Sequence, residues 1–348
     1  MGNCDDREMA MRTIVVTGGS GFIGSHFVRQ FLDDGNFRVV NIDKLTYAGQ
    51  INFDDDKAKY ENRTDYKFVH GDICDVQLVD QLFESEKPWA IVNFAAESHV
   101  DRSITDMTPF LNANILGVHN LLNAAKKHDV ARFLQISTDE VYGDTEPGVV
   151  NEEDALLAPG NPYSASKASA DLICQAFART HDLPILIARC TNNYGPKQYP
   201  EKLIPFFVLS SLRGNPLPLY GDGQQQRDWI YVDDAVRAIK LVLTEGRVGT
   251  IYNICTGAHQ TNLEIATQIC NSLAEIMDKA PEDLISNIKY VKDRPGHDRR
   301  YAMSSQRITD ELGWSPTTPV DVGLQKTVRW YFERFANDTS TFDNSAST

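Results

Sequence analysis

The chain has 348 residues, of which 42% are hydrophobic and 24% are charged, and it carries a formal net charge of −14. This length and composition predict a folded protein with a large core and two lobes rather than a disordered chain. The acidic charge argues against a nucleic-acid partner, which requires a basic face. No apolar run approaches the roughly 20 residues of a membrane span, so we expect no membrane contact.

The cysteines and the two ends of the chain indicate the compartment. The six cysteines form no CxxC pair, so we expect reduced thiols and neither a disulfide framework nor a metal site. The first residues lack a positively charged segment followed by an apolar one, so we expect no signal peptide and a cytoplasmic protein. Residues 1–11 and 337–348 are polar and irregular, and we predict that both are disordered tails.

The first element is a strand over residues 13–17, which a helix over residues 22–32 follows after Gly18, Gly21 and Gly24. Glycines let the backbone approach a pyrophosphate, and the helix N-terminus offers free N–H groups and the positive end of a dipole. The GxxGxxG spacing is one residue longer than GxGxxG, and a lone glycine triplet is weak evidence. Here both flanks fit, so the stretch predicts a dinucleotide site.

The second strand, residues 38–42, ends at Asp43. An acid about 20–25 residues after the glycines can accept the hydroxyls of the adenosine ribose, and its charge repels a 2′-phosphate. We therefore predict NAD rather than NADP as the cofactor. Lys44 follows directly and weakens that discrimination, and the alternative for Asp43 is a turn or a helix cap.

Strands over residues 67–70 and 90–96 alternate with helices over residues 77–83 and 108–128. Such alternation predicts an α/β fold of the Rossmann type, with a doubly wound parallel sheet. At the strand ends, Asp72 can accept the adenine amino group while Ile73 packs on the ring, and the small residues Ala95 and Ala96 let a cofactor approach.

A strand over residues 131–136 leads into Ser137 and then Thr138, Asp139 and Glu140. Neighbouring carboxylates repel, so one tends to keep its proton at neutral pH while the other stays ionised. The pair therefore offers one acid and one base to a single substrate. The alternative is a pair of loop charges that face water.

A helix from Pro162 to about Arg179 carries Tyr163 and Lys167 four residues apart, on one face. A cation beside a phenol favours the phenolate, so we expect a lowered pKa of Tyr163 and a general base that works near neutrality. A Tyr-xxx-Lys pattern by itself is mostly structural, and its weight comes from the glycine turn and Asp43.

A strand over residues 184–189 ends in a loop, residues 190–196, where we place the boundary between two lobes. Residues 12–193 form the predicted NAD-binding domain, to which residues 229–258 return, and residues 194–336 form a smaller C-terminal substrate-binding lobe. That lobe concentrates cations that suit a diphosphate: Arg227, Arg294, Arg299 and Arg300. Ordinary ion pairing with aspartates is the alternative for Arg299 and Arg300.

From about Arg12 to Tyr331 the chain resembles the extended short-chain dehydrogenase/reductase family. The resemblance rests on TGGSGFIGS, NIDKLTYAG, HGDICD, FAAESHVDRSI, STDEVYG, YSASKASAD, NNYGP, PEKLIP, RDWIYVDD and RPGHDRRYA. Within that family the chain is most similar to the nucleotide-sugar 4,6-dehydratases, because the related 4-epimerases lack the acid pair of Thr138-Asp139-Glu140.

The resemblance implies a reaction and a set of contacts. It implies that Tyr163, helped by Lys167 and Thr138, takes the proton of the 4-hydroxyl of dTDP-glucose while C4 is oxidised by NAD. Glu140 then removes the C5 proton, Asp139 protonates the leaving 6-hydroxyl, and the hydride returns to C6. The predicted cofactor set is Gly18, Gly21, Phe22, Ile23, Gly24, Asp43, Lys44, Thr46, Asp72, Ile73, Ala95, Ala96, Ser137, Tyr163, Lys167, Cys190 and Asn192. The predicted substrate set is Ser98, Thr138, Asn193, Lys202, Leu203, Arg227, Asn262, Arg294, His297 and Tyr301.

Two departures from the family pattern lie near the substrate lobe: Lys197 stands where relatives more often carry an aromatic residue, and Cys255-Thr256-Gly257 replaces a glycine-richer stretch. They leave UDP-glucose open as an alternative substrate. Two further functions stay open: an NDP-sugar 4-epimerase and a catalytically silent NAD-binding regulator. The resemblance also implies a homodimer that pairs the Tyr163 helix and the 108–128 helix in a four-helix bundle.

Overall fold

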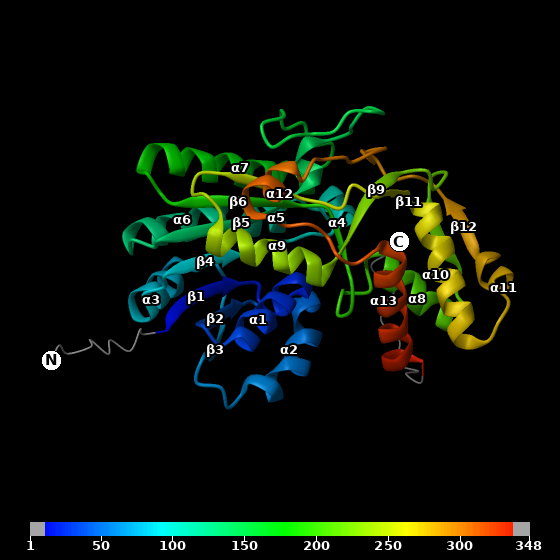
Figure 1. The fold of residues 1–348 in the computed structure, drawn as a ribbon, viewed down its shortest axis with the longest axis horizontal. Helices are drawn as coiled ribbons and strands as arrows, with labels where there is room; N and C mark the ends of the chain where they lie inside the picture. The colour runs from blue at the N-terminus through cyan, green and yellow to red at the C-terminus, as the bar shows by residue number, and fades with distance from the viewer. Residues whose placement is uncertain (1–10, 337–348) are drawn as a thin grey trace.

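The computed structural model describes residues 11–336, so the predictions about tails at residues 1–10 and 337–348 lie outside the described residues. A parallel sheet of seven strands forms the larger part of the molecule (Figure 1), in the order β10-β6-β5-β4-β1-β2-β3. The strands are β1 Arg12–Thr17, β2 Phe37–Asp43, β3 Tyr66–His70, β4 Ala90–Asn93, β5 Arg132–Thr138, β6 Ile185–Cys190 and β10 Ile251–Ile254. The prediction of a doubly wound α/β fold is confirmed.

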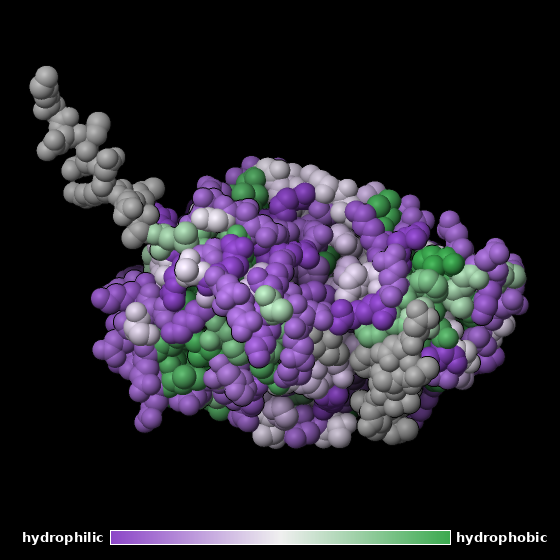
Figure 2. Space-filling view, turned by 90° about the horizontal axis from the view of Figure 1, so that it is seen from below, coloured by the Kyte–Doolittle hydropathy of each residue, from purple (hydrophilic) through white to green (hydrophobic). Residues whose placement is uncertain are grey.

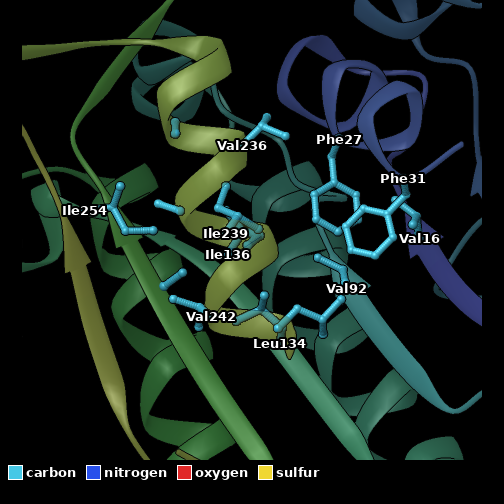
Figure 3. Packing of buried hydrophobic residues seen from close by; sticks show 14 of the residues in the cluster. Val16, Phe27, Phe31, Val92, Leu134, Ile136, Val236, Ile239, Val242 and Ile254 are labelled. Carbon is cyan, nitrogen blue, oxygen red and sulfur yellow. The ribbon is translucent and has the colours of Figure 1, made fainter. Parts of the chain in front are cut away.

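Helices cover both faces of this sheet. Apolar side chains of α3 Val76–Glu86, α6 Val118–Lys127 and α7 Pro162–His181 pack on one face. Those of α1 Phe22–Asp34, α9 Val232–Glu245 and α12 Gln306–Leu312 pack on the other. In Figure 3, Phe27 and Phe31 of α1 and Val236, Ile239 and Val242 of α9 point toward the sheet. A strand buried on both faces needs a nearly continuous apolar sequence, which is why β1 and β4 could be predicted as strands from the sequence.

Strand β1 pairs with both β2 and β4, so the strand order reverses between β1 and β4. The turns after β1, β4 and β5 leave the sheet at its carboxyl edge, beside the reversal in strand order. Ligands of open α/β sheets bind outside that edge at such a reversal. The glycine turn and the acid pair therefore lie along the same edge of the sheet, although more than 100 residues separate them.

Several predicted boundaries differ from the observed ones. The strand predicted over 90–96 ends at Asn93, and the strand predicted over 131–136 continues to Thr138. The predicted 108–128 helix consists of α5 Thr108–Phe110, a π-helical segment η1 Leu111–Gly117, and α6. The predicted loop after β6 contains a short strand, β7 Asn192–Tyr194, because its backbone pairs with β9 Gln226–Tyr231.

The C-terminal part of the chain adds two small sheets and four helices on the right of Figure 1. One sheet has the order β11-β9-β7 and the other pairs β12 with β8. Helices α8, α10 and α13 pack around a core of their own. These elements are α8 Leu203–Leu212, β8 Leu217–Tyr220, β11 His259–Thr261, α10 Asn262–Met277, α11 Pro281–Ile285, β12 Ile288–Val291 and α13 Val320–Phe335.

The remaining elements are α2 Tyr47–Tyr60, α4 Val100–Thr105 and a 3-10 turn, η2, at Asp139–Tyr142. The face in Figure 2 is mostly hydrophilic, with small separate apolar areas. Among the described helices none combines the length and apolarity that a bilayer crossing needs. Within residues 11–336 no group of three or more His, Cys, Asp or Glu side chains is arranged to hold a metal ion, and the five cysteines there are free.

Candidate active site

The glycine turn between β1 and α1 packs so closely that side chains have no room. Gly18 has a φ of +68°, and a Cβ there would lie 2.6 Å from the backbone nitrogen of Ala95. A Cβ on Gly24 would collide with the carbonyl oxygen of Gly18. The Gly21 N–H donates to that carbonyl at 3.0 Å, which closes the turn. The N-terminus of α1, where Phe22 and Ile23 are the first residues, thus has no side-chain cap and lies beside the end of β4.

Asp43, at the end of β2, is buried and accepts hydrogen bonds from the Ser20 N–H at 2.9 Å and the Leu45 N–H at 2.8 Å. Burial raises its pKa, and these two bonds oppose the rise. The carboxylate is therefore tied to the glycine turn, where a ribose beside the pyrophosphate would lie. Lys44 makes an ion pair with Asp72 at 2.7 Å, so its charge is partly neutralised.

The other predicted cofactor residues line the same edge. Ile73 is buried, and its carbonyl accepts from Asn120 at 2.6 Å, which fixes the chain after β3. Thr46 is the N-cap residue of α2 but makes no side-chain cap bond. The Ala95 N–H donates to Thr17 at 3.3 Å, Ala96 is exposed, and Cys190 is buried at the end of β6. Asn192 is half-buried on β7.

Three observations fit a dinucleotide at this edge. The glycine turn packs so tightly that a Cβ at Gly18 or Gly24 would collide with the neighbouring backbone, and Asp43 is held beside the turn. In addition, the Ser137 hydroxyl at the end of β5 is buried and has no hydrogen-bond partner among the described residues. A buried unpaired hydroxyl is costly, so its position favours a polar ligand group beside it.

Tyr163 lies in the first turn of α7 and is almost fully buried. Burial raises the pKa of its phenol well above the usual value, and the charges of Glu140 and Asp139 raise it further, while a hydrogen bond with Thr138 opposes them. The lowered pKa that we predicted from Lys167 is therefore wrong for the protein alone. The Lys167 Nζ donates to the Ile136 carbonyl at 2.7 Å, and burial lowers the pKa of this amine.

Asp139 and Glu140 open η2 directly after β5, and both influence the phenol of Tyr163 electrostatically. The Asp139 side chain is buried, and burial, followed by repulsion from Glu140, raises its pKa to about 7. The Thr191 hydroxyl lies 2.8 Å from Asp139 Oδ2. Asp139 is thus poised to hold a proton near neutrality. The two carboxylates do not face water as a loop pair.

Glu140 has a different environment. Its Oε2 accepts hydrogen bonds from the Ser164 hydroxyl at 2.9 Å and the Asn161 amide at 3.3 Å. These two donors fix the position of the Glu140 carboxylate. Asn161 also caps α7, since its Oδ1 accepts from the Ser164 N–H at 2.9 Å. Sequence reasoning missed both residues as site residues, although an asparagine before Pro162 is a helix-start signal.

The predicted substrate cations lie on segments that the fold brings toward η2. Arg227 is buried on β9, stacks on the Tyr301 ring with its guanidinium 4.1 Å from the centroid, and donates to the Asp298 carbonyl at 2.8 Å. The Tyr301 hydroxyl donates to the Asp298 carboxylate at 2.7 Å and lies 3.5 Å from Glu140 Oε2. A guanidinium braced in this way presents its remaining donors in a fixed direction.

Other predicted substrate contacts keep unused hydrogen-bonding capacity. The Arg294 Nε and the Asn193 Oδ1 are buried without partners among residues 11–336. His297 contacts Asp293 at 2.6 Å, yet burial, with Arg294 next, lowers its pKa to about 4. Lys202 donates to the Ser98 carbonyl at 2.8 Å, which joins two predicted contacts.

Four further predicted residues can be placed. Leu203 and Asn262 begin α8 and α10, and the Asn262 N–H donates to the Gln225 carbonyl at 3.0 Å. Arg299 forms an exposed ion pair with Asp222 at 2.7 Å, so this arginine makes an ordinary pair with an aspartate. The Arg300 guanidinium instead donates to the carbonyls of Glu146 and Val149.

Comparison with known proteins gives the chain relatives over nearly its whole length. A family model described as GDP-mannose 4,6 dehydratase matches residues 15–327. The dTDP-glucose 4,6-dehydratase of Salmonella typhimurium is 47% identical over 336 residues, which cover 91% of this chain and 92% of that protein.

Solved structures agree in fold. The dTDP-glucose 4,6-dehydratase DesIV of Streptomyces venezuelae, with NAD and TYD bound, has a TM-score of 0.85 and 45% identity, covering 92% of this chain and 97% of that one. The UDP-glucuronic acid 4-epimerase of Bacillus cereus, in complex with UDP-glucuronic acid and NAD, has a TM-score of 0.84 but only 27% identity, covering 93% and 100%. The backbone alone therefore does not separate the two activities.

Proposed function

Because the chain belongs to the GDP-mannose 4,6-dehydratase family, we propose that it is an NAD-dependent 4,6-dehydratase that converts dTDP-glucose into the 4-keto-6-deoxy sugar. One observation carries the reaction type. Beside the Tyr163 phenol stand two acids with opposite environments, Asp139 with a pKa of about 7 and Glu140 held by two hydrogen-bond donors. An epimerase has no use for such a pair.

The acids divide the elimination between them. Bound NAD supplies a hydride acceptor and, in its oxidised form, a positive charge that lowers the pKa of a neighbouring phenol. Tyr163, bonded to Thr138, accepts the proton of the 4-hydroxyl. Glu140 removes the C5 proton, which the 4-ketone makes acidic, and Asp139 protonates the departing 6-hydroxyl. Lys167, which is held on the Ile136 carbonyl, would favour the phenolate electrostatically once the cofactor is bound.

The side chains that would contact the nucleotide sugar include arginines that neighbouring residues hold in place. The diphosphate would be held by Arg227 and Arg294, of which the second has an unused Nε. His297, Tyr301, Asn262, Lys202 and Leu203 would complete the nucleotide site, while Ser98 and Asn193 would contact the sugar. The pyrophosphate of the dinucleotide would lie on the start of α1, with Asp43 on the ribose.

We also propose the division into lobes, the assembly and the compartment. Residues 12–193 with 229–258 would form the NAD-binding lobe, and residues 194–336 mainly the nucleotide-sugar lobe. Three exposed leucines, Leu111 and Leu116 on η1 and Leu172 on α7, support a homodimer through these neighbouring segments. The free thiols in the described residues support a reducing compartment, the cytoplasm.

A direct assay tests the function. The holo-protein is incubated separately with dTDP-glucose and UDP-glucose, and the products are examined in alkali, where a 4-keto-6-deoxy sugar absorbs and an epimerised hexose does not. We expect the absorbing product with dTDP-glucose at a higher kcat/KM. An epimerised hexose would overturn the proposed reaction, and preference for UDP-glucose would overturn only the proposed substrate.

A further inference from the structure

The Thr191 hydroxyl, between β6 and β7, has two acceptors within hydrogen-bond distance. It lies 2.8 Å from Asp139 Oδ2 and 2.9 Å from the backbone carbonyl of Asp228 on β9. The Thr191 side chain is buried, so water does not share these contacts freely. A hydroxyl has one proton to donate and two lone pairs to accept with.

The number of available protons determines whether Thr191 can form hydrogen bonds with Asp139 and with the Asp228 carbonyl at the same time. The Asp228 carbonyl can only accept, so the Thr191 proton must point to it if that contact is a hydrogen bond. The Thr191 oxygen can then only accept, and Asp139 has to supply the second proton. Both contacts are hydrogen bonds together only when Asp139 is protonated. If Asp139 is ionised, Thr191 must turn its proton to the carboxylate and leave the Asp228 carbonyl.

The second hydroxyl near Asp139 does not change this count. Thr138 Oγ1 lies 3.2 Å from Asp139 Oδ1, but it also accepts from the Glu140 N–H at 3.3 Å and bonds to Tyr163. Its proton is therefore shared with the phenol. Asp228, for its part, is fixed, because its carboxylate accepts from the Thr256 N–H and from the Gly257 N–H at 2.6 Å.

Glu140 provides the contrast. Ser164 and Asn161 both aim donors at its Oε2. Asp139 instead contacts two hydroxyls, those of Thr191 and Thr138, and each of them has a second hydrogen-bond partner. The neighbours of the two carboxylates therefore differ: Glu140 faces two donors, whereas the hydroxyl of Thr191 is shared between Asp139 and the Asp228 carbonyl.

We propose that Thr191 is a positioning residue that orients the Asp139 carboxyl group as the acid of the pair and stabilises its carboxylate once the proton has been given away. This inference rests on the proposed dehydratase function. In the free site the Thr191 proton points to the Asp228 carbonyl, and Thr191 accepts from Asp139. After proton transfer it rotates and donates to the Asp139 carboxylate.

The elimination balances with these roles. The C5 proton passes to Glu140, the C6–O bond breaks as the C5–C6 double bond forms, and the Asp139 proton joins the leaving oxygen to give water. Glu140 returns its proton to C5 when the hydride reaches C6. The proton that Tyr163 took from the 4-hydroxyl replaces the one that Asp139 lost, so one water molecule is the net loss.

The charged and titratable groups around Asp139 come from every neighbouring element. Glu140 of η2 and Asp228 of β9 disfavour its charge, and Arg227 of β9 favours it. Tyr163 of α7, Cys190 of β6 and Cys255 after β10 also lie within electrostatic reach, and burial keeps their own pKa values above the ordinary range. The hydrogen bond between the Thr191 hydroxyl and Asp139 lowers the Asp139 pKa. Its removal should therefore raise that pKa further.

The experiment compares Thr191→Val with Thr191→Ser, and with Thr327→Val as a matched control. Thr327 on α13 is also buried and also donates to a backbone carbonyl, that of Gly323 at 2.7 Å, but it lies outside the proposed site. With dTDP-glucose, kcat of Thr191→Val should fall about tenfold, the effect of one lost hydrogen bond. Thr191→Ser should recover most of the rate.

A second substrate separates a role in acid catalysis from structural damage. A dTDP-glucose analogue with fluorine in place of the 6-hydroxyl loses fluoride without protonation. Thr191→Val should eliminate fluoride within about twofold of the parent rate, and the alkaline limb of its kcat profile with dTDP-glucose should move to higher pH. Equal losses with both substrates, or an unmoved limb, would overturn the role of Thr191.

The outcomes also separate this inference from the function on which it rests. A parent protein that gives no 4-keto-6-deoxy product contradicts the dehydratase proposal itself. A parent protein that is active, with Thr191→Val equally active, contradicts only the role of Thr191. Melting temperatures of Thr191→Val and Thr327→Val should fall by similar amounts, so that stability does not explain the difference in rate.

Discussion

The Ser164 hydroxyl donates a hydrogen bond to Glu140 Oε2 at 2.9 Å, so the helix that carries the phenol of Tyr163 also fixes the neighbouring carboxylate. Asn161 reinforces the contact from the cap of the same helix. One rigid element therefore sets the separation between the phenol proposed to act at C4 and the carboxylate proposed to act at C5. This arrangement makes the order of the chemical steps testable.

Glu140→Gln should separate oxidation from elimination. The amide keeps the size of the side chain and its contact with Ser164 but cannot take the C5 proton. We expect dehydration to fall by at least about 100-fold, the effect of losing a general base, while C4 oxidation continues. Reduced nicotinamide should then accumulate and be visible in the absorbance spectrum. Normal turnover by this variant would contradict the assignment of the C5 base.

Asp139→Asn should stabilise the protein in a pH-dependent way. The pKa of Asp139 is about 7 in the folded protein and near 3.8 when unfolded. The folded state therefore binds more protons between these values, and the stability contribution of Asp139 is present below pH 3.8 and lost as pH rises through 7. Asparagine stays neutral throughout. The melting temperature of the variant, relative to the parent, should rise by a few degrees from pH 4 to pH 8, and a constant difference would contradict the raised pKa.

Gly18→Ala and Gly35→Ala form a matched pair. Both glycines have positive φ, +68° and +69°, so both substitutions cost about 1 kcal/mol of backbone strain. A Cβ at position 35 meets nothing within 4 Å, whereas one at position 18 meets the backbone of Ala95 and Phe94. We expect Gly35→Ala to keep its bound nicotinamide and Gly18→Ala to lose it. Equal cofactor content in the two purified variants would sink the glycine-turn assignment.

Asp43→Asn tests cofactor choice. The amide oxygen can still accept from the Ser20 N–H, so the turn should keep its shape, but the charge that repels a 2′-phosphate is gone. The ratio of NADP to NAD affinity should rise about tenfold or more, as the loss of one close like-charge contact predicts. Titration of the apo-protein with both dinucleotides measures this ratio. Because Lys44 is paired with Asp72, Lys44→Ala should change the ratio much less.

Apolar sequence runs were sufficient to predict the sheet, because strands buried on both faces have little choice of residue type. The glycine turn, Asp43, the acid pair and the Tyr163 helix were also readable, since each has a local spacing that a physical role explains. The secondary-structure predictions were wrong where an element depends on pairing with a distant part of the chain. β7 looked like a loop because its three residues become a strand only against β9.

The sequence by itself determined the doubly wound sheet, and it was enough to propose the glycine turn and the candidate catalytic side chains, because those depend on local pattern and residue type. Only the tertiary structure decided the surroundings of the titratable groups. Burial, followed by the charges of Glu140 and Asp139, raises the pKa of the Tyr163 phenol, and folding brings the hydroxyls of Thr191 and Ser164, which are 27 residues apart in number, onto the two adjacent carboxylates. A pKa depends on what folding brings within a few ångströms, and no spacing along the chain encodes that distance.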